Sequence, residues 1–115
     1  MKVTALLVVT GSMLFSASMF AGTCEINFTR TACPGKETIS FKKCGGKASC
    51  TEFQDVANAS LCKTAAIAAC ANDRLTVTKL KVITAKFDGA DLKTDTGSTD
   101  FCTAYPKAAD EFNKC

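Results

Sequence analysis

Eight cysteines are the residues of this sequence with the most versatile chemistry, since a thiol can attack an electrophile, bind a metal or form a disulfide. Successive cysteines lie 9, 11, 6, 12, 8, 32 and 13 positions apart, so none forms the Cys-x-x-Cys pair of redox sites or the short paired spacings of zinc sites. An even number at this density is typical of a small extracellular domain with disulfides. The sequence therefore predicts four structural disulfides and leaves their connectivity open. The cysteines are Cys24, Cys33, Cys44, Cys50, Cys62, Cys70, Cys102 and Cys115.

Histidine is absent from the chain, which excludes Ser-His-Asp and Cys-His catalysis and every histidine-ligated metal site. Four aspartates follow one another in the polar segment 88–100, but their spacing is not that of an EF-hand loop. We interpret this segment as a solvated loop. The sequence thus predicts a protein that is not an enzyme and that uses no metal and no cofactor. The four aspartates are Asp88, Asp91, Asp95 and Asp100.

The first 21 residues have the three parts of a secretory signal peptide: a basic residue, a short apolar run and a small-residue end. A membrane-spanning helix needs about 20 predominantly apolar residues, whereas threonine, glycine and serine interrupt this run. We predict that residues 1–21 are a cleaved signal peptide, although cleavage after Gly22 fits almost as well. Residues 22–115 would then form a single cysteine-rich domain in an oxidising location, either secreted, periplasmic or at a cell surface.

Cys24 lies so close to this leader that lipid attachment is the alternative to a disulfide. Bacterial lipoprotein signals have a small residue directly before the cysteine, but here Thr23 occupies that position. Acylation would also leave seven cysteines, and hence one unpaired thiol in an oxidising compartment. We therefore expect a disulfide at Cys24 and no stable membrane anchor.

The remaining chain combines strand and helix patterns, which predicts a small α+β domain with an antiparallel sheet. Residues 24–33 alternate polar and apolar side chains, with Ile26 and Phe28 on one face, as in a half-buried strand. A turn at 34–37 leads to a second predicted strand at 38–43, which could complete a hairpin.

An alanine-rich stretch predicts the main helix, over about residues 51–72. A break at Asn58 or Ser60 would divide it into two pieces. Its approximate apolar stripe consists of Phe53, Val56, Leu61, Ala65 and Ala68.

Residues 74–87 carry the strongest strand pattern, because valine, isoleucine, threonine and leucine predominate. The apolar positions change parity along this segment, which requires either a bulge near Thr78 and Lys79 or two consecutive strands. Lys79, Lys81 and Lys86 would discourage aggregation along an exposed edge.

A C-terminal helix is predicted to follow the polar loop, with Ser98 or Thr99 as its N-cap. Its core-facing residues would be Phe101, Tyr105, Ala109 and Phe112.

Helix geometry limits the possible disulfides. If Cys62 and Cys70 share one helix, about 12 Å separates them along the axis, whereas a disulfide needs Cα atoms within about 7 Å. They therefore cannot bond to each other, and they would instead link the helix to the sheet or to the C-terminal segment. A local bond between Cys44 and Cys50 is sterically possible.

Charge is weak overall but unevenly distributed. The full chain has 14 basic and 11 acidic side chains. Removal of Lys2 with the signal peptide leaves a formal net charge of +2. Such a small charge does not indicate nucleic acid or an anionic membrane as a partner. Residues 24–50 have a net charge of +3, and residues 88–111 have a net charge of −4. These two regions could attract each other within one molecule or between molecules, so self-association is possible.

These observations favour a secreted or periplasmic non-catalytic binding protein whose partner is another protein. An inhibitor of an extracellular hydrolase is the most specific form of this hypothesis, because rigid disulfide-linked loops lose little entropy on binding. The alternatives are a structural or surface-assembly subunit that associates head-to-tail, and a small secreted toxin or effector. The candidate binding loops contain Pro34, Gly35, Lys36 and Glu37 in one turn, and Gly45, Gly46 and Lys47 in the other.

Overall fold

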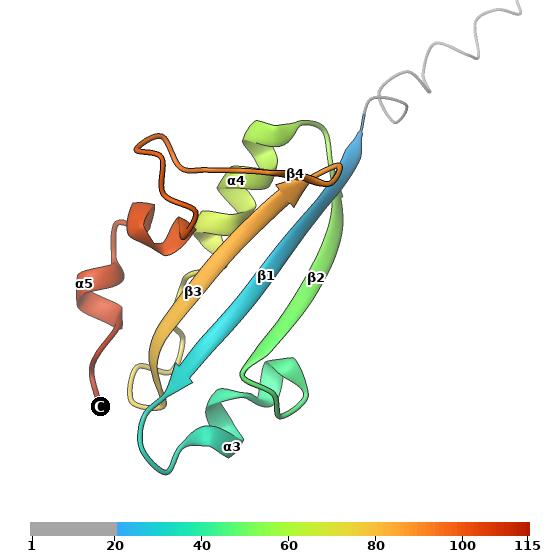
Figure 1. The fold of residues 1–115 in the computed structure, drawn as a ribbon. Coiled ribbons are helices and arrows are strands. Elements are labelled where there is room, and N and C mark those ends of the chain that lie inside the picture. Colours follow the sequence, from blue (N-terminus) through green and yellow to red (C-terminus); the bar gives the residue numbers. More distant parts are fainter. Residues whose placement is uncertain (1–20) are drawn as a thin grey trace, which may run out of the picture.

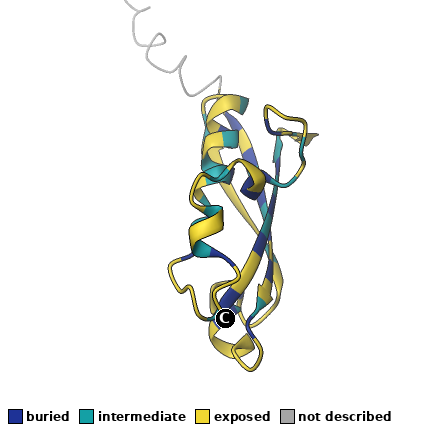
Figure 2. Ribbon diagram, turned by 90° about the vertical axis from the view of Figure 1, so that its left-hand side faces the viewer, coloured by how far each residue is buried: buried dark blue, intermediate teal, exposed yellow. Residues whose placement is uncertain are grey.

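The computed structural model describes residues 21–115, so the predicted signal peptide at 1–21 lies outside the described residues except for its last position. These residues form two layers, a four-stranded antiparallel sheet and a set of helices that cover one of its faces (Figures 1 and 2). The other face of the sheet is open to solvent. The predicted α+β class is therefore confirmed.

The sheet has the strand order β2-β1-β3-β4. The long strand β1 (Gly22–Ala32) lies in the centre and pairs antiparallel with both β2 (Ser49–Val56) and β3 (Thr78–Phe87). β2 and β3 are consequently parallel to each other, and helix α4 (Ala59–Ala68) makes the crossover between them on the covered face (Figure 1). The two-residue strand β4 (Ala90–Asp91) pairs with the end of β3.

The alternation predicted for the first strand is present. Ile26 and Phe28 point into the core together with Cys24, whereas Thr23 and Thr29 are exposed on the open face. The bulge predicted near the start of β3 is also confirmed, because the pairing with β1 shifts by one residue around Lys79. This extra residue brings Ile83 and Ala85 onto the buried face.

The predicted second strand at 38–43 is wrong. This segment forms a short helix α3 (Glu37–Ser40) and a 3-10 turn η2 (Lys42–Cys44). Its alternating pattern did not indicate a buried face, because Ile39 is 44% exposed. Backbone hydrogen bonds fold the segment back on itself, and β2 occupies the position beside β1 that this segment was predicted to take.

The main helix is shorter than the predicted range of 51–72. Residues 51–56 belong to β2, and α4 begins only after Asn58, whose side-chain Oδ1 accepts a hydrogen bond of 2.9 Å from Leu61 N. Asn58 lies two residues beyond the end of β2 and, with an extended backbone, serves as the N-cap of α4. The predicted apolar stripe does not form the buried face, because Phe53 is 66% exposed and Leu61 is 48% exposed. The buried residues of α4 are Cys62 and Ala66.

The predicted C-terminal helix is divided into a 3-10 turn η3 (Phe101–Ala104) and a short helix α5 (Ala108–Glu111). Its N-cap is Asp100 rather than Ser98 or Thr99, and the Asp100 carboxylate accepts hydrogen bonds from Cys102 N at 3.0 Å and from Ile83 N at 3.1 Å. Asp100 is therefore a structural residue that ties the loop to β3, not a solvated one. Phe101 and Phe112 are buried and Tyr105 is half-buried, whereas Ala109 is exposed, contrary to expectation.

All eight cysteines form disulfides. Cys62 and Cys70 are not bonded to each other, as predicted, although Cys70 lies two residues beyond the end of α4 rather than in the same helix. One bond joins α4 to β1, another joins the residue just beyond α4 to η3, and a local bond closes the loop before β2. Half-cystines also fill the core, in which three of them have no solvent exposure. The pairs are Cys24–Cys62, Cys33–Cys115, Cys44–Cys50 and Cys70–Cys102.

No helix among residues 21–115 is both long enough and apolar enough to span a membrane.

Candidate functional site

The two candidate binding loops lie at the same end of the sheet, around α3 (Figure 1). Residues 34–37 lead from β1 into α3, and residues 45–47 follow η2, with Gly35, Gly45 and Gly46 all at positive φ. All of these residues are exposed, although Glu37 is the first residue of α3 rather than part of the turn. The structure therefore brings the two loops to one end of the molecule.

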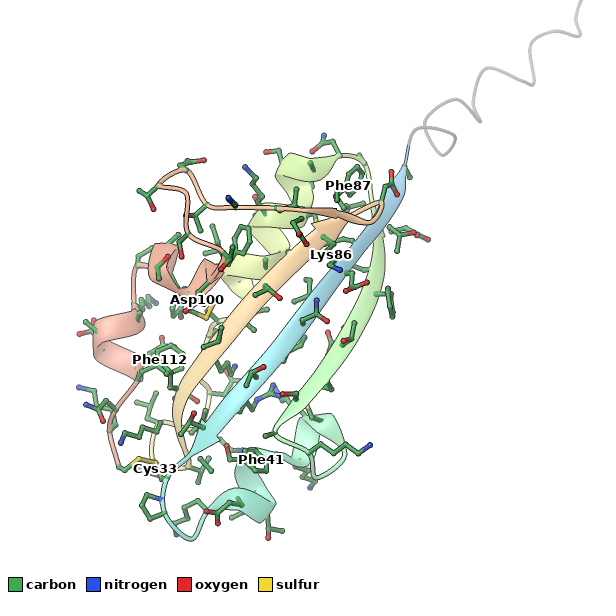
Figure 3. The ribbon with its side chains drawn as sticks, in the orientation of Figure 1. Cys33, Phe41, Lys86, Phe87, Asp100 and Phe112 are labelled. Carbon is green, nitrogen blue, oxygen red and sulfur yellow. A yellow bond between two sulfur atoms is a disulfide. The ribbon has the colours of Figure 1, made fainter. Side chains whose placement is uncertain are left out.

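A cavity of about 460 Å³ opens beside these loops, between the α3–η2 segment, the ends of β1 and β3, and the residues just before β3. In Figure 3, Phe41 and Cys33 mark this end of the sheet. The cavity wall contains five basic side chains and one acidic side chain, Asp73. We call this cavity the cationic pocket. Its basic residues are Arg30, Lys42, Lys43, Arg74 and Lys81.

Two of these cations lie side by side on the covered face of the sheet. Arg30 in β1 is paired directly with Lys81 in β3, and the two residues are 6% and 7% exposed. Like charges opposite each other in a sheet are destabilising, and burial adds the loss of hydration. This arrangement therefore reduces stability unless an anion compensates it.

The Arg30 guanidinium is held by two neighbours. Its Nη1 donates to Cys44 Sγ at 2.8 Å, and its Cζ lies 5.2 Å from the centre of the Phe28 ring. Burial lowers the pKa of Arg30, an effect that the charge of Glu52 partly offsets. No enclosed side-chain nitrogen among the described residues lacks a hydrogen-bond partner. Arg30 is part of the pocket wall, where an anion could accept hydrogen bonds from its other N–H groups.

The Lys81 ammonium is directed toward the end of α4. It donates hydrogen bonds to the carbonyl oxygens of Ala69, at 3.3 Å, and Ala71. Cations are favoured at this end of a helix, because its last carbonyl groups carry partial negative charge. Burial, followed by the charges of Arg30 and Lys43, nevertheless lowers the pKa of Lys81 to about 8. Lys81 thus lies on the covered face of the sheet, as part of the pocket wall.

No carboxylate neutralises these two buried cations directly. Among residues 21–115, the ion pair within 4 Å is the one between Lys43 and Asp73, at 3.5 Å, and both of its side chains are strongly exposed. The single acid of the pocket is therefore engaged with a rim lysine, while Arg30 and Lys81 have only neutral hydrogen-bond acceptors. The electrostatic field of the pocket favours an anion.

A hydrogen-bonded network makes the far wall of the pocket rigid. The Asn72 side chain donates to the backbone oxygens of Thr78, at 2.9 Å, and Glu111, at 2.7 Å. Asn72 N donates to the Glu111 carboxylate at 2.8 Å, which is the main reason why the pKa of Glu111 is lowered. Burial and the bond to Glu111 raise the pKa of Tyr105, whose hydroxyl donates to the same carboxylate. Glu111 is thus committed to holding the C-terminal segment against the pocket.

The pocket does not contain an assembled nucleophile and base. Ser40 Oγ and Thr78 Oγ1 are 2.7 Å apart and hydrogen-bond to each other, while Lys81 Nζ bonds to backbone carbonyls. A hydroxyl nucleophile would need a base within hydrogen-bonding reach. No group of three or more potential metal ligands occurs in the described part of the chain. The pocket instead presents two buried cations whose hydrogen-bond partners are neutral.

Sequence reasoning missed this pocket, although one signal for it was present. Arg30 has the same parity as Ile26 and Phe28, so it occupies a position on the predicted buried face of the first strand. A charged residue in such a position is informative, because charged side chains are rarely buried. Lys81 was predicted to lie at an exposed edge and gave no such signal. What the sequence did not show was that Arg30 and Lys81, 51 positions apart, are directly paired.

No protein-family model matches this chain, and no curated protein or solved structure is similar to it. The geometry and charges of the pocket are therefore what indicate a function.

Proposed function

We propose that this chain is a non-catalytic extracellular binding protein that holds an acidic group of a partner protein in the cationic pocket. The observation that carries this proposal is the buried pair Arg30 and Lys81, which no carboxylate within the described residues neutralises. A carboxylate inserted between them would receive charge-assisted hydrogen bonds, which are stronger than neutral ones. It would also relieve the repulsion between the two cations.

The surroundings of the pocket suit a protein partner better than a small free anion. Ile39 and Val77 contribute apolar surface to the pocket wall, and the exposed loops at 34–37 and 45–47 extend the same end of the molecule. The Cys33–Cys115 and Cys44–Cys50 disulfides restrain these loops. The loops would therefore lose little conformational entropy when a partner binds. An extracellular hydrolase with an acidic surface group remains the most specific partner that we propose.

An extracellular or periplasmic location is supported by the four disulfides and by the signal-peptide pattern at 1–21. Disulfides of this number persist in oxidising compartments and are rare in the cytosol.

The test uses isotope-labelled protein and a short peptide that contains two glutamates, with the corresponding glutamine peptide as reference. We expect saturable NMR shift changes at the pocket residues with the glutamate peptide alone. Arg30→Met should weaken binding about tenfold or more, because it removes the charged hydrogen-bond donors. It should still fold, since it removes one of two opposed cations and retains an unbranched apolar side chain.

Lys79→Gln is the matched control, because Lys79 is exposed, lies two positions from Lys81 and is not among the residues of the pocket wall. It removes the same unit of charge and should leave binding nearly unchanged. Equal losses of affinity in Arg30→Met and Lys79→Gln would show that only general electrostatic attraction is involved, and would contradict the proposal.

A second function, head-to-tail assembly, is favoured by the distribution of acidic residues. Asp88 and Asp91 flank the β3–β4 turn, which lies at the end of the sheet opposite α3 (Figure 1). The basic pocket and this acidic end could join successive copies in an open chain. Size-exclusion chromatography at low and high salt tests this, and a monomer at every concentration and salt would exclude it. The toxin or effector hypothesis has no such support in the structure.

A further inference from the structure

The strand β2 lies at one edge of the sheet and pairs only with β1. Six of its eight residues are exposed and the other two, Cys50 and Val56, are half-buried. Phe53 is 66% exposed, more than any other large hydrophobic residue of the described chain. Edge strands are usually protected by charged residues, proline or a bulge; β2 has two carboxylates but no lysine, proline or bulge.

Backbone geometry shows which groups are free along this edge. Ala48 O accepts a hydrogen bond of 2.8 Å from Arg30 N, and the register from Thr29↔Ser49 to Gly22↔Val56 continues without a shift. Along an antiparallel strand, the backbone N–H and C=O groups of successive residues point alternately to one side and the other. The backbone groups of every second residue after Ala48 therefore point toward β1. The residues between them direct both N–H and C=O away from the sheet. These outward residues are Ser49, Thr51, Phe53 and Asp55.

This edge is held in the extended form before any partner arrives. The Cys44–Cys50 disulfide fixes its beginning, and the cap at Asn58 fixes the chain just beyond its end. Pairing with β1 runs along its whole length. An incoming strand would therefore lose its own conformational freedom but would not need to order β2.

We propose that β2 docks an extended basic segment of another protein, which adds antiparallel to the sheet as a further strand. Charge complementarity selects this occupant, because Glu52 and Asp55 are the only charged residues of β2. Phe53 and Asp55 share the open face, and Glu52 lies on the opposite face. The complementary segment has a basic residue opposite Asp55, an apolar one opposite Phe53 and a basic one opposite Glu52, in the order basic-x-apolar-basic.

A second copy of this chain fits the edge less well. Two β2 strands paired with each other would bring four carboxylates to one seam, two from each copy. Like charges across such a seam are unfavourable. The proposal concerns a different surface from the cationic pocket and does not depend on it.

The probe is a synthetic peptide with the pattern Thr-Lys-Thr-Val-Lys-Thr-Val, and the reference is the same peptide with glutamate at both lysines. Amide hydrogen exchange of the labelled protein reports the site of binding. We expect the lysine peptide to protect the amides of Thr51 and Phe53, which are directed outward. The amides of Glu52 and Gln54, which β1 already protects, should not change.

Thr51→Pro removes one outward N–H and leaves the bonds between β1 and β2 intact, since Thr51 N is not directed at β1. Thr51→Val is the matched control, because both variants lose the 2.6 Å hydrogen bond from Thr51 Oγ1 to Asn27 Oδ1 but valine keeps the N–H. We expect about tenfold weaker peptide binding for Thr51→Pro and little change for Thr51→Val.

Equal affinity for the two peptides, or equal binding by Thr51→Pro and Thr51→Val, would overturn the proposal. So would protection confined to residues outside β2. Sedimentation without peptide supplies the remaining outcome: a dimer that Thr51→Pro dissociates would assign the edge to a second copy and reject the basic partner.

Discussion

Arg30 and Lys81 face each other across β1 and β3 at positions where the preceding pairs, Phe28 with Ile83 and Ile26 with Ala85, are apolar. The same ladder thus changes from a hydrophobic core to a pair of cations within two residues. Burial makes this pair unfavourable in the absence of a ligand, since both charges have lost most of their hydration. Residues that reduce stability in this way are common at functional sites.

The lowered pKa of Lys81 leads to a prediction at this scale. Its pKa is about 8 in the folded protein and 10.5 ordinarily, so below pH 8 both states are charged and the folded state carries the whole penalty. Between pH 8 and 10.5 the folded state has lost a proton that the unfolded chain retains. The contribution of Lys81 to the free energy of unfolding therefore rises with pH in this range. Arg30 and Lys43 promote this deprotonation, whereas Asp73 and Glu111 oppose it.

We therefore expect the wild type to gain stability relative to Lys81→Met between pH 7.5 and 9.5, by on the order of 1 kcal/mol after allowance for screening by water in the pocket. Urea unfolding of both proteins at the two pH values measures this difference. A constant difference between them would show that Lys81 does not titrate in this range.

At the scale of elements, the boundary between β2 and α4 depends on Asn58. Residues 51–72 contain many alanines, and the sequence alone predicted helix on both sides of a break at Asn58 or Ser60. The first six of these residues instead complete the edge of the sheet, because pairing with β1 outweighs their helix propensity. Asn58 favours the start of the helix at this point, since its side chain accepts a hydrogen bond from Leu61 N.

Asn58→Ala should lower the free energy of unfolding by about 1 kcal/mol, because Leu61 N loses its partner at the start of α4. Asn58→Asp keeps an acceptor at the same position and should stay near the wild type. Thermal unfolding of the two variants compares them directly. Equal destabilisation by alanine and aspartate would mean that the side-chain cap contributes nothing.

At the scale of the whole molecule, disulfides hold both ends of the described chain. Cys24–Cys62 joins the start of β1 to α4, and Cys33–Cys115 joins the end of β1 to the last residue. The disulfide expected at Cys24 is therefore present, and Cys115 holds the other end in the same way. Phe112, three residues before Cys115, is buried in the same C-terminal segment (Figure 3).

The double variant Cys33→Ser, Cys115→Ser tests how much the disulfide that closes the longest loop contributes to stability. The bond spans 82 positions, and releasing a loop of that length should lower the free energy of unfolding by about 4 kcal/mol. The corresponding Cys44→Ser, Cys50→Ser variant opens a separation of only 6 positions and should lose less. Urea unfolding of both double variants under non-reducing conditions gives the comparison, and a larger loss for the shorter loop would contradict this account.

The sequence by itself determined the features that depend on neighbouring residues. The alternation around Ile26 and Phe28 follows from the local geometry of a strand. The change of parity near Lys79 limited the choice to a bulge or two consecutive strands, and the bulge formed. Local patterns failed where two structures were compatible with the same residues, as at 38–43 and at 51–56. There, the choice depended on which segment pairs with β1.

The tertiary structure alone decided the disulfide connectivity, the position of the cationic pocket and the exposure of β2. Each of these brings together segments far apart in the chain, such as Arg30 with Lys81 and Cys33 with Cys115. Periodicity reports only which face of its own element a residue occupies. It does not report which residue of another strand lies opposite, and that pairing turns two unremarkable basic residues into a candidate binding site.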